Sequence, residues 1–321
     1  MPAETPGTPT GAPTVPTAPS GDPTTVGNGG RGDARIHDIG YRGYSGERLG
    51  RSAGRRALFE HSLRGAYGLG RSARSKVMPF LLFAIVCFPA VIFVAIAITI
   101  GLDELPIRYS QYPLYMAQLI ALYIALAAPQ MVSLDLRHHT TPLYFSRPIE
   151  RVDYVLAKLG ALTAALFIFT AIPLTIMWIG ALLGELDFAD QIRMYGQGLA
   201  MAAIFAVLHA CLALLIASFT PRRGFGVAAV IAALTIPYFA VISVQWVLYD
   251  QGGTTAVTWL GLLSPGTLLD GIQGALLGGR TDYPVGTEPG TGTGLVFLLV
   301  ALGVSALCVL LLSRRYRKVG I

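Results

Sequence analysis

Long, uninterrupted apolar segments dominate this sequence and restrict the folds open to it. A helix that crosses the hydrocarbon core of a bilayer needs about 20 predominantly apolar residues, and six segments have this character. They are continuously apolar, whereas strands of a transmembrane barrel alternate polar and apolar residues. The sequence therefore predicts an all-α polytopic membrane protein with six transmembrane helices. The predicted spans cover residues 78–101, 113–133, 154–183, 196–218, 225–248 and 294–313.

The composition agrees with a membrane location and offers no metal site. Of the 321 residues, 53% are hydrophobic and 13% are charged, whereas about a quarter of the residues of a soluble domain are charged. Cys87, Cys211 and Cys308 all fall inside apolar segments, so we interpret them as small buried hydrophobic residues. No Cys/His spacing typical of a metal site occurs.

Three regions follow one another along the chain. Residues 1–34 are rich in Pro, Thr and Gly, a composition that buries too little apolar surface to fold, so we expect a disordered cytoplasmic tail. Residues 35–77 are a basic segment on the cytoplasmic side. Residues 78–321 form the transmembrane domain.

The basic segment contains a candidate helix that begins near Arg55. Phe59, Leu63 and Tyr67 recur every fourth residue, while Arg64 belongs to a basic face. This pattern is typical of an interface helix in the headgroup layer, in contact with membrane lipid. A basic tail without a helix is the alternative, because three nearby glycines disfavour helix.

Basic residues also predict the orientation of the spans, since cytoplasmic loops carry the excess of Lys and Arg. With a cytoplasmic amino terminus, only Arg108, Arg193 and Arg280 of the 24 basic residues fall on the outer side. We therefore predict an integral cell-membrane protein with both termini in the cytoplasm. Anionic headgroups account for the net charge of +6, so no nucleic acid is needed as a partner.

The connection between the last two predicted spans, residues 249–293, contains the apolar run WLGLLSPGTLLDGIQGALLGG. A seventh span here would move the basic carboxy terminus to the outer face. Pro265 and several glycines also interrupt the run. We expect an exoplasmic re-entrant helical hairpin that holds Asp270 near the outer surface.

No catalytic motif stands out. The phosphate loop GxxxxGK[ST] is absent, as is HExxH, and we expect neither an enzyme nor a cofactor bound by this chain. His209, Gln130 and Gln245 lie inside predicted spans and are candidates for an intramembrane polar site. For His209, a hydrogen bond to a neighbouring helix is the simpler interpretation.

A polar loop, residues 134–153, joins the second and third predicted spans. Two prolines bracket a short apolar group, and charged residues follow at helical spacing. An apolar group flanked by charges is suited to a groove on a cytoplasmic partner. The candidate residues are Asp135, Arg137, Leu143, Tyr144, Phe145, Arg147, Pro148, Glu150 and Arg151.

The same loop carries a family resemblance. It contains Asp135, a Thr pair, a leucine, the tripeptide Ser-Arg-Pro at 146–148 and then Arg151, and Lys158 follows shortly after it. This order resembles the loop of the ABC-2 type family of ABC transporter permeases, which have six spans and cytoplasmic termini. The basic helix and SPGTLLDGIQGAL resemble that family's interface helix and exoplasmic hairpin. RHHTTPLY replaces the Glu-Arg-Gly-Thr-Leu-Glu type run that is common in the family.

The resemblance implies a permease subunit that pairs with a second permease subunit, of the same or a homologous chain, and with two separate ABC ATPase subunits. ATP and Mg²⁺ would bind to those ATPases, which would drive export of a lipid-like or amphipathic small molecule. A membrane-anchored assembly or scaffold protein that recruits cytoplasmic partners is the alternative. A secondary transporter and an intramembrane enzyme fit the sequence less well.

Overall fold

The computed structural model describes residues 46, 49–137, 144, 149–220 and 223–318. The chain divides into two compact units, Met1–Glu47 and Arg48–Ile321. All regular secondary structure in the described ranges is helical and belongs to the second unit. The predicted disordered tail lies outside the described residues.

Five helices are long and apolar enough to cross a membrane, which confirms a helical membrane protein. They coincide with the first, third, fourth, fifth and sixth predicted spans. Several begin or end a few residues beyond the predicted limits, because helices extend past the hydrocarbon into polar sequence. The five are α2 (Ala73–Ile100), α6 (Arg151–Leu183), α7 (Phe188–Phe219), α8 (Arg223–Asp250) and α11 (Thr291–Lys318).

The second predicted span is divided into two helices. A single turn, α3 (Tyr112–Tyr115), is followed at Met116 by α4 (Ala117–Arg137). The apolar part of α4 ends at Ser133, so it is about 26 Å long at 1.5 Å per residue. This is slightly less than the roughly 30 Å of hydrocarbon in a bilayer.

The predicted basic helix is present as α1 (Arg51–Ala66), which begins before Arg55. Of the three glycines that disfavour helix, only Gly65 lies inside it. Gly68 follows with φ = 68°, and a Cβ there would lie 2.4 Å from the Ser75 carbonyl oxygen. The glycine therefore allows a tight turn between α1 and α2.

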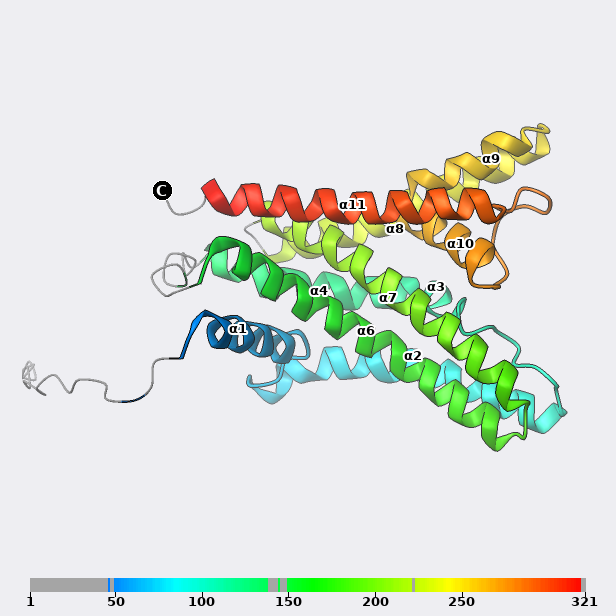
Figure 1. Cartoon of the computed structure of the whole chain (residues 1–321), viewed down its shortest axis with the longest axis horizontal. Coiled ribbons are helices and arrows are strands. Elements are labelled where there is room, and N and C mark those ends of the chain that lie inside the picture. Colours follow the sequence, from blue (N-terminus) through cyan, green and yellow to red (C-terminus); the bar gives the residue numbers. More distant parts are fainter. Residues whose placement is uncertain (1–45, 47–48, 138–143, 145–148, 221–222, 319–321) are drawn as a thin grey trace, which may run out of the picture. The chain divides into compact units, whose positions relative to one another are not determined.

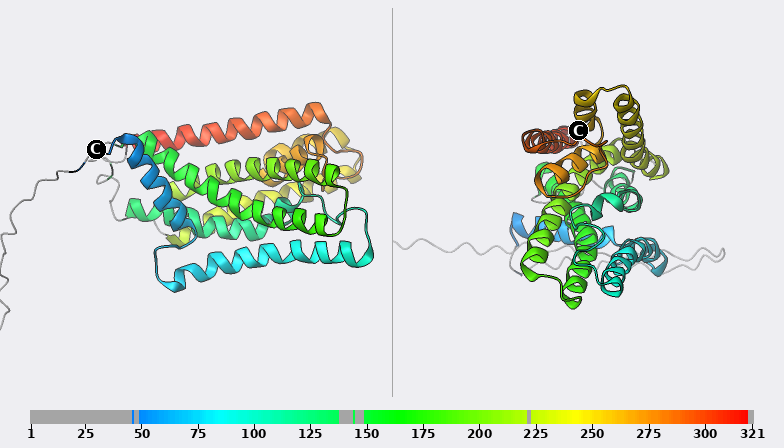
Figure 2. Two further views of the ribbon diagram at one scale, coloured as in Figure 1. Left: turned by 60° about the horizontal axis from the view of Figure 1, so that its bottom comes forward. Right: turned by 90° about the vertical axis from the view of Figure 1, so that its right-hand side faces the viewer.

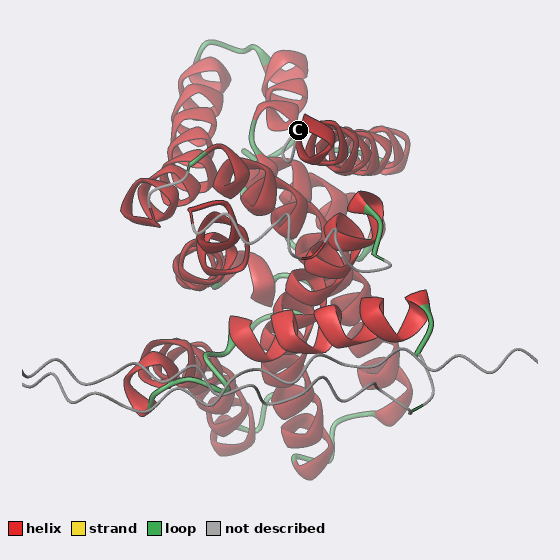
Figure 3. Ribbon diagram, turned by 90° about the vertical axis from the view of Figure 1, so that its left-hand side faces the viewer, coloured by secondary structure: helices red, strands yellow, loops and turns green. Residues whose placement is uncertain are grey.

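The helices of this unit define two ends of a bundle. One end holds both α1, which lies across the bundle, and the carboxy terminus of α11 (Figures 1 and 3). At the other end lie α3, α9 (Thr254–Leu260), η1 (Gly261–Leu263) and α10 (Pro265–Leu276). We call them the α1 end and the α10 end.

Between the two ends, α6 is packed against α7, α1 and α2, while α4 is packed against α8 and α7. α2 and α11 lie on opposite sides of the bundle (Figure 2). The Tyr123 ring of α4 stacks on the Phe169 ring of α6 with centroids 4.3 Å apart, and Phe83 of α2 meets Phe169 edge-on at 5.3 Å. These aromatic contacts join three helices in the core.

The connection after α8 forms two short helices rather than a continuous one. Ser264 caps α10, its hydroxyl oxygen accepting a hydrogen bond of 3.2 Å from the Gly266 N–H. Pro265 occupies the first helical position, where its missing N–H costs nothing. The helix break expected at Pro265 is therefore present.

Close packing around Gly198 of α7 allows a direct test of this fold. A Cβ on Gly198 would lie 2.5 Å from the Tyr109 Cβ and 3.1 Å from its carbonyl carbon. Because backbone cannot yield easily, we expect Gly198→Ala to lower the free energy of unfolding by about 1–3 kcal/mol, measured by denaturation in detergent.

Gly196→Ala is the matched control, since a Cβ at Gly196 meets nothing within 4 Å. That variant should be neutral or more stable, because alanine is the better helix former. Equal effects of the two substitutions would contradict the packing of α7 described above.

Candidate functional site

Polar and charged side chains gather at both ends of the bundle. At the α1 end they surround the two described flanks of the predicted loop 134–153, and we call this group the loop-flank cluster: Arg51, Arg55, Asp135, Glu150, Arg151, Asp153, Tyr154 and Lys158.

The first part of the loop-flank cluster attaches α1 to the start of α6. Arg51 donates from Nε to Asp153 Oδ2 at 2.6 Å and from Nη2 to Asp153 Oδ1 at 3.0 Å, and it also contacts Glu150. Arg55 lies 3.7 Å from Asp153 Oδ1. Hydrogen bonding to Asp153 raises the pKa of Arg51, so the guanidinium remains charged. The two-pronged geometry fixes the direction of α1 as well as its position.

A second contact joins the end of α4 to α6. Lys158 Nζ lies 2.9 Å from Asp135 Oδ2, with side chains 5% and 17% exposed. The Tyr154 hydroxyl donates to the same carboxylate oxygen at 2.7 Å. Because α4 precedes the predicted loop and α6 follows it, the ion pair ties the two flanks of the loop together.

The carboxy-terminal helix also contacts this cluster. The Tyr154 ring lies 5.0 Å from the Tyr316 ring and 5.7 Å from the Tyr144 ring. Arg151 donates from Nη1 to the Arg317 carbonyl oxygen at 3.1 Å. The loop flanks therefore contact α1, α4, α6 and α11.

The predicted loop residues are only partly described. Tyr144 packs inward, half-buried, while the Glu150 side chain is exposed. Arg137 is the last residue of α4. The remaining predicted positions, Leu143, Phe145, Arg147 and Pro148, lie outside the described residues.

The predicted interface helix turns its apolar residues toward the bundle. Phe59, Leu63 and Tyr67 are half-buried against the core, and the Tyr67 hydroxyl donates to the Ala165 carbonyl oxygen of α6 at 2.7 Å. Arg64 is largely exposed and lies 3.9 Å from Glu60 of its own helix. The apolar residues identified in the sequence thus pack against the core, and Tyr67 contacts α6.

The three candidates for an intramembrane polar site lie in separate places. Gln130 accepts a hydrogen bond of 3.2 Å from Arg71, and Gln245 donates to the Val257 carbonyl oxygen at 2.9 Å. His209 contacts the Phe205 carbonyl oxygen of its own helix through Nδ1 at 3.0 Å. The described contacts therefore do not join these residues into one site.

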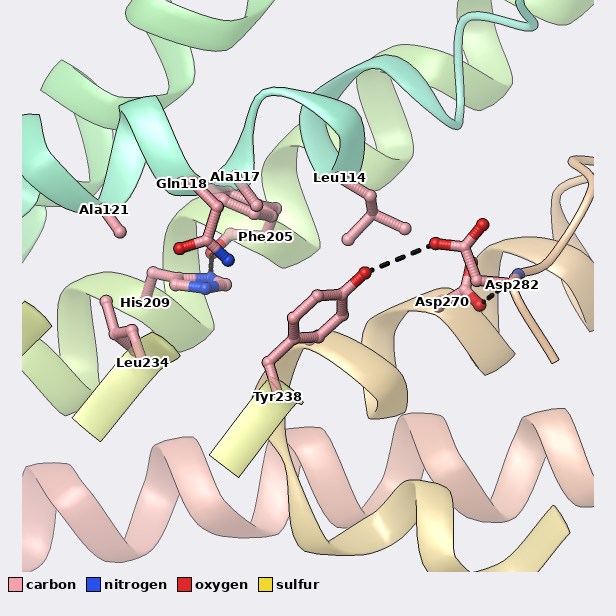
Figure 4. A pocket seen from close by; sticks show the side chains of 11 residues that line it. Leu114, Ala117, Gln118, Ala121, Phe205, His209, Leu234, Tyr238, Asp270 and Asp282 are labelled. Atoms are coloured by element: carbon pink, nitrogen blue, oxygen red, sulfur yellow. Dashed lines mark hydrogen bonds between the residues drawn. The ribbon is translucent and has the colours of Figure 1, made fainter. Parts of the chain in front are cut away.

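At the α10 end, His209 lines a small cavity that is partly open to solvent. We call this cavity the polar hollow. Gln118 of α4, Tyr238 of α8, Asp270 of α10 and Asp282 of the following connection also face it (Figure 4). Its remaining walls are mainly apolar.

Asp270 is the most buried carboxyl group of the polar hollow, at 6% exposure. Its oxygens accept hydrogen bonds from Gln273 Nε2 at 3.0 Å and from the Asp282 N–H at 2.8 Å. The Tyr238 hydroxyl donates to Asp282 Oδ2 at 3.3 Å. Burial raises the pKa of Asp270 to about 7. Asp270 thus lies inside the protein, and its position near the outer surface of the membrane stays a prediction.

Sequence reasoning missed the polar hollow as a site. Asp282 and Tyr238 carry no motif, and they come from parts of the chain that only the tertiary fold brings together. Ser264 and Pro265, which begin the helix that carries Asp270, were the available signal.

No protein-family model matches this chain, and no curated protein is similar to it. In the described parts of the chain, no three His, Cys, Asp or Glu residues are placed to hold a metal ion. The chain is thus a helical membrane protein with five candidate spans in its described residues.

The buried ion pair generates one stability prediction. Asp135→Ala leaves the Lys158 ammonium buried without its counter-charge, so we expect a loss of about 3–5 kcal/mol in unfolding free energy. Replacing both residues, as in Asp135→Leu with Lys158→Met, should recover most of that loss. Glu60→Ala removes an exposed pair with Arg56 and should cost less than about 1 kcal/mol. Equal losses for the buried and exposed pairs would contradict this account.

Asp270 generates a prediction on pH. The folded protein holds its proton up to about pH 7, whereas an unfolded chain releases it near pH 4. The folded state therefore binds more protons between these values, and its stability falls as the pH rises through that window. Asp270→Asn should flatten this part of the profile, measured by thermal unfolding in detergent. An unchanged profile would show that Asp270 is not the responsible group.

Proposed function

We propose that this chain is an ABC-2 type permease, the membrane-spanning subunit of an ATP-driven transporter. Two separate ABC ATPase subunits would bind ATP and Mg²⁺, and a second permease subunit would complete the complex. The transported compound would be a lipid-like or amphipathic small molecule, moved outward. The order of residues in loop 134–153 supports the family assignment.

The observation that carries the proposal is the convergence of helices on the loop flanks. The ion pair between Asp135 and Lys158 joins α4 to α6, Arg51 joins α1 to Asp153, and Arg151 reaches α11. A force applied to the loop would therefore act on several helices together. A subunit driven from outside its own chain requires such a connection.

The proposed topology has six spans, with α4 as the shortest. Both termini would face the cytoplasm, so that the α1 end is the cytoplasmic end and the protein lies in the cell membrane. Residues 249–293, with α9 and α10, would form an exoplasmic re-entrant hairpin. The apolar part of α4 is slightly too short to cross the hydrocarbon core alone. In the proposed topology, α3 or local thinning of the bilayer would complete this second span.

In this mechanism, ATP binding closes the two ATPases and displaces the loop. Arg147, Glu150 and Arg151 would contact the ATPase surface, as their place in the loop suggests. The displacement would tilt α4 and α6 and open an outward path.

A membrane-anchored scaffold protein is the second candidate, because the loop could recruit a cytoplasmic partner without any transport. The half-buried aromatic residue Tyr144 and exposed Glu150 suit either role. A neighbouring reading frame with a phosphate loop and an LSGGQ-like signature would favour the permease.

The deciding experiment is co-purification with that ATPase. We expect the ATPase to co-purify with the full chain and to hydrolyse ATP faster when transported compound is present. Arg147→Glu with Arg151→Glu should abolish both effects, because charge reversal opposes docking. Arg193→Glu, an exposed residue at the opposite end, is the control and should leave association unchanged. Full association and turnover in the double variant would refute the proposal.

A further inference from the structure

Three basic residues mark the start of α2, where the chain enters its first candidate span. Arg71 lies in the turn after α1, and Arg74 and Lys76 belong to the first turn of α2. Arg71 and Arg74 are exposed, and Lys76 is partly exposed. A spanning helix begins at one of the two bilayer surfaces, so these side chains lie at the depth of the lipid headgroups. This holds whichever end of the bundle faces the cytoplasm.

The described part of the protein supplies no counter-charge for these three residues. Among the ion pairs of the described residues, none includes any of the three. The sequence has no acidic residue between Glu60 and Asp103. Arg71 donates from Nη1 to the neutral side chain of Gln130 at 3.2 Å, and no other described hydrogen bond uses its guanidinium group. Its remaining N–H groups can therefore bind an anion.

The basic residues of α1 differ, because carboxylates lie beside them. Arg56 and Arg64 lie 3.0 and 3.9 Å from the carboxylate oxygens of Glu60. Arg51 is bound to Asp153. A cation that already faces a carboxylate attracts a further anion less strongly than one that does not. The start of α2 is therefore better suited to an anion than α1 is.

An exposed apolar face of α2 continues directly from these charges. Val77 and Leu81 are 58% and 50% exposed, and they follow Arg74 by three and seven residues, which places all three on one face of the helix. Phe80, 49% exposed, follows Lys76 by four residues. Side chains on a helix lean toward its amino terminus, so the basic groups point away from the apolar face. This combination matches a phospholipid, whose charged headgroup stands above its acyl chains.

We propose that Arg71 and Arg74 bind the phosphate of an anionic phospholipid whose acyl chains lie along the exposed apolar face of α2. Lys76 adds positive charge at the edge of that face. Guanidinium groups bind phosphate through paired N–H donors. An anionic lipid such as phosphatidylglycerol also carries the net charge that a zwitterionic lipid lacks. We call this the α2 lipid site. It needs neither ATPase nor transport, so it goes beyond the proposed function and does not depend on it.

Arg71 also connects the α2 lipid site to the rest of the bundle. It lies in the turn between α1 and α2, and its hydrogen bond to Gln130 reaches α4. A bound headgroup would therefore restrain three helices at their common end. A ligand that binds only the folded state raises its stability. We expect phosphatidylglycerol to raise the midpoint of thermal unfolding above that in phosphatidylcholine with the same acyl chains.

The test is native mass spectrometry of the full chain, which counts the phospholipids that remain bound after release from detergent. We expect phosphatidylglycerol to be retained in preference to phosphatidylcholine with the same acyl chains. Arg71→Gln with Arg74→Gln should lower this preference by about fivefold for each charge removed. Arg56→Gln with Arg193→Gln is the matched control, because it removes the same charge from exposed side chains that have carboxylates beside them. The control should change the preference little.

Two further measurements locate the lipid. Arg74→Gln alone keeps the hydrogen bond between Arg71 and Gln130, so it remains informative if the double variant unfolds. Phosphatidylglycerol with a photoreactive acyl chain should label α2 within residues 77–92, where its exposed apolar side chains lie. Inorganic phosphate should not displace the bound lipid, because it makes no contact with the apolar face.

Equal retention of the two phospholipids would overturn the α2 lipid site. Equal losses in the two double variants would also overturn it, because they would show diffuse attraction to the total charge. Photolabelling confined to other helices would place the lipid elsewhere. Displacement by inorganic phosphate would show that the ligand is a free anion and would refute the lipid assignment.

Discussion

Backbone hydrogen bonding is the constraint on which this structure depends. Peptide groups in hydrocarbon have no water to bond, so each must find its partner within the protein. Helices meet this requirement within a single segment, which explains why all the regular structure in the described ranges is helical. The exceptions are at the α10 end, where Ser264 caps a new helix and Gln245 satisfies the Val257 carbonyl group. Side chains there replace the backbone partners that a continuous helix would have supplied.

The same constraint explains what the sequence could predict. Apolar length and proline positions are local properties, so five predicted spans reappear as α2, α6, α7, α8 and α11 with shifted ends. The second span was predicted less well, because Met116 interrupts it without any proline or glycine at that position. α1 was predicted by its spacing of Phe59, Leu63 and Tyr67. That these residues also pack against the core of the bundle depends on tertiary packing.

The candidate sites differ in the same way. The flanks of loop 134–153 could be recognised because their residues follow one another, although the pairing of Lys158 with Asp135 needed the fold. The polar hollow draws on five helices and a connection, and no sequence spacing relates Gln118 to Asp282. Its buried carboxyl group, that of Asp270, lies in the short helix α10, in an otherwise apolar region of the sequence. A charged residue in such a region is a useful signal of a site, even where its partners cannot be predicted.

The turn at Gly68 has a mechanical consequence. Only a few residues separate the end of α1 at Ala66 from the start of α2 at Ala73, and the Ser75 hydroxyl donates back to the Gly68 carbonyl oxygen at 3.3 Å. The turn is thus closed onto the first turn of α2, with little slack between the two helices. Rotation of α1 about its contact with Asp153 would therefore also move the start of α2. A movement that begins beside the loop would reach the opposite side of the bundle without passing through its core.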